Sequence, residues 1–222
     1  MKLLAIETSG PRGSIAISID GCLVEQRWLQ TDGRRHAQTL TADLDQLLRE
    51  LEILPAEIDV VAVSIGPGSF TGLRVGLTCA KTFAWLNECR LVAIETPAIV
   101  ARQANPQIPV VRVIQDALRG EFFMAAYRIT ETGQRVSEAD VCLIPGTELP
   151  TDVPLAGQGI EKLAPECLAR FQTTDSAEWE PRAATVATIG WEFALIERFC
   201  DTATLEPLYI RRSYAEEKRA SG

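Results

Sequence analysis

The chain has 222 residues, of which 46% are hydrophobic, and its formal net charge is −8. This length suits one large domain or two lobes of about 100 residues each, with ample apolar content for a packed core. The acidic balance argues against tight, independent binding of nucleic acid. We find no apolar run long enough to span a bilayer and no leader, so the sequence predicts a cytoplasmic protein that does not enter a membrane.

Three antiparallel strands are expected to open the chain, at residues 2–7, 14–19 and 22–29. Residues 14–19 alternate apolar and polar side chains with the period of a strand, and Asp20-Gly21 is a strong hairpin signal. The first strand ends on an acidic residue, Glu7.

A helix over residues 36–51 follows a loop at 30–35. Its apolar residues are spaced three, four, three and four apart, which is the spacing of a heptad seam; they are Ala37, Leu40, Leu44, Leu47 and Leu51. Such a seam packs either against a second protein or, as an equally serious alternative for a helix this short, against the sheet of its own domain.

The stretch at residues 58–86 is the one around which the rest of the chain is organised. A buried strand at 60–65 leads through Gly-Pro-Gly into a helix that ends near residue 86, with Ser69 or Thr71 as its cap. Gly72 and Gly76 lie on one face of this helix and allow a second backbone to approach. The glycine spacing matches neither a Walker loop nor a dinucleotide fingerprint, so a strand-to-helix turn is favoured over a phosphate cradle.

The second half of the chain repeats the first in outline. After a strand at 90–94 and a helix near 98–103, strands are expected at 110–115, 121–128 and 134–143, then at 153–156, followed by a helix over 184–200. The strand at 110–115 is followed by an acid, Asp116, as the first strand of the chain ends on Glu7. We therefore predict an internal duplication, with lobes at residues 1–104 and 105–222.

Several strings together resemble the TsaB (YeaZ) family. The most specific is GPGSFTGLRVG at residues 66–76, and it is accompanied by ETSGPRGSIAI at 7–17, HAQTL at 36–40, DALRGEFF at 116–123 and PLYIR at 207–211. The resemblance implies an α/β fold of the actin, Hsp70 and sugar-kinase type, with two tandem ribonuclease-H-like lobes.

The resemblance also implies a function. The family supports the TsaD transferase, with the ATPase TsaE joining the complex, in forming N6-threonylcarbamoyladenosine beside the anticodon of tRNAs that read codons beginning with A. Two positions depart from the family pattern. Glu7 stands where Asp is common, and Asp116-Ala117-Leu118 stands where Asp-Ala-Arg is common.

The residues also bear on catalysis. Zinc or iron chemistry of the kind used by TsaD-like transferases or by metalloproteases needs at least two histidines at helical spacing and a third ligand, and the chain has one histidine, His36. No G-x-S-x-G string supplies a nucleophile. The six cysteines form no C-x-x-C pair and are expected to be reduced thiols. We therefore predict no catalytic residue, no metal site and no enzyme activity.

One enzymatic alternative remains open. Glu7 and Asp116 end equivalent strands of the two predicted lobes, and actin-like folds place such acids near Mg²⁺ and phosphates. An ATPase or kinase that uses these acids in the cleft is the alternative function. Otherwise the chain has no cofactor of its own, and ATP or ADP with Mg²⁺ would be bound only in the complex.

The predicted interface comprises the two helices at residues 36–51 and 70–86. Two helices from each partner would form a four-helix contact. The chain alone would form a homodimer through the same surface and would reach tRNA only through the complex. The expected interface residues are His36, Leu40, Leu44, Leu47, Leu51, Thr71, Gly72, Val75, Gly76 and Cys79.

Overall fold

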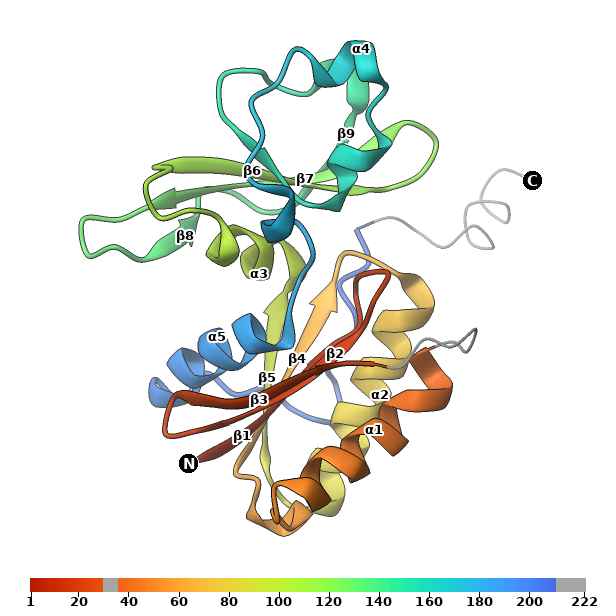
Figure 1. Cartoon of the computed structure of the whole chain (residues 1–222), viewed down its shortest axis with the longest axis vertical. Helices are drawn as coiled ribbons and strands as arrows, with labels where there is room; N and C mark the ends of the chain where they lie inside the picture. Colours follow the sequence, from red (N-terminus) through yellow and green to blue (C-terminus); the bar gives the residue numbers. More distant parts are fainter. Residues whose placement is uncertain (30–35, 211–222) are drawn as a thin grey trace.

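The computed structural model describes residues 1–29 and 36–210, with the side chains of residues 36–38 outside the description. Two lobes lie one above the other along the longest axis of the molecule (Figure 1). The first lobe holds a five-stranded sheet in the order β3-β2-β1-β4-β5. β1 at its centre is antiparallel to β2 and parallel to β4. Its strands are β1 Lys2–Glu7, β2 Ser14–Ile19, β3 Cys22–Trp28, β4 Val60–Gly66 and β5 Arg90–Glu95. The strands predicted for this part of the chain are confirmed to within a residue or two.

Helices cover both faces of the first sheet. α1 (His36–Glu50) and α2 (Phe70–Leu86) lie side by side on one face, and α5 (Ala183–Leu195) covers the other (Figure 1). The alternation of the strands supports both layers, because Leu4 and Ile6 pack toward α1 and α2, whereas Leu3 and Ala5 pack toward α5. Within the described residues, no helix combines the length and apolar character needed to cross a membrane.

The second sheet is smaller and has the order β10-β6-β7-β8, with β9 also paired to β7. Its strands are β6 Val110–Asp116, β7 Glu121–Ile129, β8 Arg135–Ser137, β9 Cys142–Pro145 and β10 Leu155–Ala156. The prediction of a single strand at residues 134–143 is wrong, because two short strands, β8 and β9, occupy this region. β8 pairs with the end of β7 and β9 with its beginning, and a turn in which the Ser137 hydroxyl donates to the Ala139 carbonyl separates the two.

Short helices replace long ones in the rest of this lobe. They are η2 Gly146–Glu148, η3 Gln158–Lys162, α4 Pro165–Leu168 and η4 Ser176–Glu178, whereas η1 Pro55–Glu57 precedes β4 in the first lobe. The helix predicted over residues 184–200 ends earlier, at Leu195, and Glu197 just beyond it has a positive φ of 55°.

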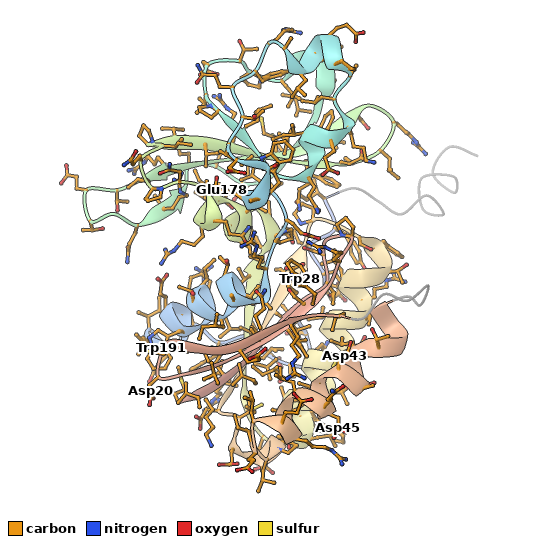
Figure 2. All side chains as sticks on the ribbon, in the orientation of Figure 1. Asp20, Trp28, Asp43, Asp45, Glu178 and Trp191 are labelled. Carbon is orange, nitrogen blue, oxygen red and sulfur yellow. The ribbon has the colours of Figure 1, made fainter. Side chains whose placement is uncertain are left out.

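The chain passes between the lobes twice, through α3 (Thr96–Gln103) and through residues 178–183. Gln103 ties the two crossings together, since its amide nitrogen donates to the carbonyls of Glu178 and Glu180, and its amide oxygen accepts from the Arg182 N–H at 3.0 Å. Figure 2 shows Glu178 at this junction and Trp28 at the end of the first sheet that faces it. The Arg12 guanidinium stacks 4.3 Å above the Trp28 ring and pairs with Glu180.

α5 belongs by sequence to the second half of the chain but packs on the first sheet. It approaches β4 so closely that a Cβ added at Gly190 would lie 2.5 Å from the Ala62 Cβ. The division of the chain between residues 104 and 105 stays a prediction. One of the helices that cover the first sheet, α5, comes from the part of the chain after this division.

Candidate functional site

The glycine-rich turn after β4 is locked to the turn between β1 and β2. The Ser69 N–H donates to the Ser9 carbonyl at 2.8 Å, and a Cβ added at Gly68 would lie 2.5 Å from the same oxygen. Gly66 and Gly68 have φ values of 111° and 157°, a region that favours glycine. The interpretation of this segment as a strand-to-helix turn therefore has a direct geometric basis.

The first turn of α2 uses its own residues to satisfy its N–H groups. Ser69 is the N-cap, because its hydroxyl oxygen accepts from the Gly72 N–H at 3.2 Å and its carbonyl accepts from the Leu73 N–H at 2.8 Å. These N–H groups are no longer open to a phosphate.

Gly72 and Gly76 face the chain's own Thr8. A Cβ at Gly72 would lie 2.0 Å from the Thr8 carbonyl oxygen, and a Cβ at Gly76 would lie 2.1 Å from the Thr8 hydroxyl oxygen. The close approach predicted for the two glycines is confirmed. The prediction that they contact another protein is wrong, because they contact Thr8 of the same chain. The surface they offer is already covered by the loop after β1.

The leucine seam of α1 is also turned inward. Leu40, Leu44 and Leu47 are 1%, 5% and 0% exposed and belong to the core between α1, α2 and the first sheet. Their assignment to an intermolecular interface is therefore corrected in favour of packing on their own sheet. Leu51 is half-buried against the same core, and the side chain of His36 lies outside the described residues.

The outer side of α2 remains open. Thr71 is exposed, and Val75 and Cys79 are half-buried at the edge of the core. Burial raises the pKa of the Cys79 thiol to about 11, which keeps it protonated at neutral pH. Larger side chains are also exposed here, and their exposed fractions are 44% for Phe70, 75% for Trp85 and 65% for Leu86.

Sequence reasoning missed these larger residues. The signal was available, because Phe70, Arg74, Thr78, Thr82 and Trp85 follow one another at spacings of three or four and are all exposed, whereas Leu73, Leu77 and Ala84 are buried. These exposed apolar side chains make the outer side of α2 a candidate contact surface for another protein.

Glu7 ends β1 in the core of the first lobe. Its side chain is 0% exposed, and one carboxylate oxygen accepts from both the N–H and the hydroxyl of Ser9. Burial raises the pKa of Glu7, although the hydrogen bonds from Ser9 act in the opposite direction. This environment disfavours the ionised carboxylate that a magnesium ion requires.

Asp116 ends β6 in the second sheet. One of its carboxylate oxygens accepts from the Leu118 N–H at 2.7 Å and so closes a turn in which Leu118 and Arg119 have φ values of 65° and 58°. In the described part of the chain, no group of three His, Cys, Asp or Glu side chains is placed to hold a metal. The two strand-ending acids therefore accept hydrogen bonds from the turns that follow them.

Comparisons with known proteins agree with this architecture. Residues 30–216 match the sequence profile of the family described as TsaD: tRNA N6-adenosine threonylcarbamoyltransferase. The chain is 26% identical to the tRNA threonylcarbamoyladenosine biosynthesis protein TsaB of Bacillus subtilis, over 98% of this chain and 97% of that protein. It is 30% identical to an uncharacterised protein of Mycobacterium tuberculosis, over 96% of this chain and 93% of that one.

The fold has a solved counterpart. The structure of YeaZ from Pseudomonas aeruginosa superposes with a TM-score of 0.80 at 21% identity, covering 94% of this chain and 99% of that one. The predicted α/β fold class is thereby confirmed.

Proposed function

Because this chain belongs to the family described by the TsaD profile, and within it to the TsaB (YeaZ) proteins, we propose that it is the partner subunit of a TsaD-type transferase. In this role it supports the formation of N6-threonylcarbamoyladenosine beside the anticodon of tRNAs that read codons beginning with A. The observation that carries the proposal is the match to a protein named TsaB over nearly the full length of both chains.

The proposed role is that of a scaffold without catalytic residues. It is supported by the state of the two acids on which cleft chemistry would depend, since Glu7 is buried beside Ser9 and Asp116 binds the backbone of its own turn. ATP or ADP with Mg²⁺ would then enter only with the assembled complex, as would the ATPase TsaE and the tRNA. We place this work in the cytoplasm.

The proposed contact surface is the outer side of the layer formed by α1 and α2. Its support is the exposure of Phe70, Trp85 and Leu86 on α2, with Thr71, Val75 and Cys79 between them. In the absence of the transferase, the same surface would join two copies of this chain. This revises the sequence prediction, because the large exposed residues Phe70, Trp85 and Leu86 replace the buried leucines as the main contact residues.

Reconstitution tests the function. The purified TsaD-type subunit of the same organism, an activated threonylcarbamoyl donor, TsaE, ATP and tRNA are combined with and without this chain, and the modified nucleoside is quantified. We expect product only when both subunits are present and none from this chain without the transferase. Equal product in its absence, or turnover by this chain without the transferase, would contradict the proposal.

A single variant tests the surface. Thr78 is exposed in the middle of α2, so Thr78→Arg should leave the melting temperature unchanged. It should weaken the dissociation constant for the transferase by about 100-fold or more, because a charge is forced into a closed contact. Thr132→Arg makes the same change in an exposed turn of the second lobe and should bind normally.

A further inference from the structure

Arg74 is held in one orientation on the exposed side of α2. Its guanidinium lies 3.9 Å above the centroid of the Phe70 ring, and its Nε donates to the Tyr209 hydroxyl at 2.9 Å. The two rings lie 5.5 Å apart, and both are more than 40% exposed. A long cationic side chain on a surface normally samples many rotamers, and here a ring and a hydroxyl fix it.

The segment that carries Tyr209 is itself held against β4 and α2. The Leu208 N–H donates to the Ile65 carbonyl at 2.8 Å, and the Lys81 ammonium donates to the Leu205 carbonyl at 2.9 Å. We refer to residues 203–209 as the C-terminal strap. The position of Tyr209 over Arg74 is therefore supported by a backbone hydrogen bond to β4 and by the Lys81 side chain of α2, in addition to its own contact with Arg74.

Arg74 also lacks a neutralising acid. Among the described residues, no carboxylate lies within 4.0 Å of it, whereas Arg27, Arg49 and Arg112 each pair with one. Within the same ranges, its two terminal nitrogens have no hydrogen-bond acceptor. In a chain with 30 acidic and 22 basic residues, an exposed guanidinium that is held in one orientation and has no acidic partner among the described residues is well placed to bind an anion.

We propose that Arg74 is a recognition residue of the α2 surface and that its two terminal nitrogens receive the carboxylate of an Asp or Glu from the TsaD-type subunit. The proposal rests on the proposed function, since it names a contact within that surface. The fork of the guanidinium matches a carboxylate with two parallel hydrogen bonds, and the exposed Phe70 ring beside it suits a protein contact from which water is excluded.

The surroundings favour a carboxylate over the phosphates of tRNA. Arg74 and Lys81 are the charged residues of α2, and the Lys81 ammonium is engaged with the strap. The single Arg74 guanidinium can pair with one carboxylate. The phosphate backbone of a nucleic acid is normally bound by several lysines and arginines.

The test compares four variants for binding to the purified TsaD-type subunit by calorimetry. Arg74→Ala should raise the dissociation constant about 10- to 100-fold. Arg74→Lys should recover only part of this loss, because it keeps the charge but not the fork. Tyr209→Phe should weaken binding several-fold by releasing Nε. Arg170→Ala, which removes an arginine stacked on Phe171 in the second lobe, should bind like the parent protein.

The outcomes separate this proposal from the one before it. If Arg74→Ala binds the transferase normally while Thr78→Arg does not, the carboxylate contact is wrong and the surface stands. If neither substitution changes binding, the surface itself is wrong. If Arg74→Ala leaves transferase binding intact but weakens capture of tRNA by the assembled complex, Arg74 serves a phosphate and the proposal is overturned.

Discussion

The inner and outer sides of the layer formed by α1 and α2 differ in how completely the chain covers them. On the inner side, Leu40 and Leu47 are almost fully buried, and Gly72 and Gly76 allow no room for a methyl group. On the outer side, Phe70, Trp85 and Leu86 face solvent. The difference teaches that the most regular apolar spacing in these helices identifies the residues buried in the core of the chain itself. The residues left exposed for a second protein follow a weaker sequence pattern.

Truncation of the seam should have the largest effect. Leu47→Ala removes a side chain that is 0% exposed, so we expect the free energy of unfolding to fall by about 2–5 kcal/mol because a cavity remains. Urea denaturation of the monomer measures this loss. Trp85→Ala is the matched change on the outer side and should stay within about 0.5 kcal/mol of the parent protein. Equal losses in the two variants would contradict the division into inner and outer sides.

A methyl group at Gly72 should have a smaller effect in the same direction. The added carbon would lie 2.0 Å from the Thr8 carbonyl oxygen, a backbone atom that no side-chain rotation can move. We expect Gly72→Ala to lower the free energy of unfolding by about 1–3 kcal/mol, even though alanine favours a helix by roughly 1 kcal/mol over glycine. Thr78→Ala on the outer side makes a similar gain in helix propensity without the clash. A stabilised Gly72→Ala protein would show that the loop after β1 moves freely.

The buried Glu7 should make the stability of the first lobe depend on pH. Burial raises its pKa above the ordinary value of 4.5, so its contribution to stability is fully present below pH 4.5 and is lost as pH rises through the folded-state pKa. Gln at this position does not ionise. We therefore expect Glu7→Gln to become progressively more stable than the parent protein as pH rises from 4 to 8. Denaturation curves at matched pH values measure this difference, and a difference that shrinks with rising pH would reject the assignment.

Local patterns predicted much of the fold. The strands of the first sheet followed from apolar runs and from the Asp20-Gly21 turn, and Ser69 was one of the two caps proposed for α2. Periodicity revealed the apolar face of α1 but not what covers it, because a heptad seam and a stripe that packs on a sheet share the same spacing.

The features that the sequence analysis missed depended on distant contacts. Arg74 and Tyr209 are separated by 135 positions, and their contact exists only because the chain returns to α2 after α5. The interruption between β8 and β9 likewise depends on both strands pairing with β7, which composition does not reveal.

The placement of α5 has a consequence for synthesis of the chain on the ribosome. The first sheet is complete once β5 has emerged, and α3 packs on part of the face formed by Leu3, Ala5, Ala62 and Val92, but α5 is needed to cover the rest. At about 5–20 residues per second, the ribosome needs roughly 5 to 20 s to extend the chain from the end of β5 to the end of α5. During that interval the nascent protein exposes much of this apolar face, so a chain stalled or truncated before α5 should be a client of ribosome-associated chaperones.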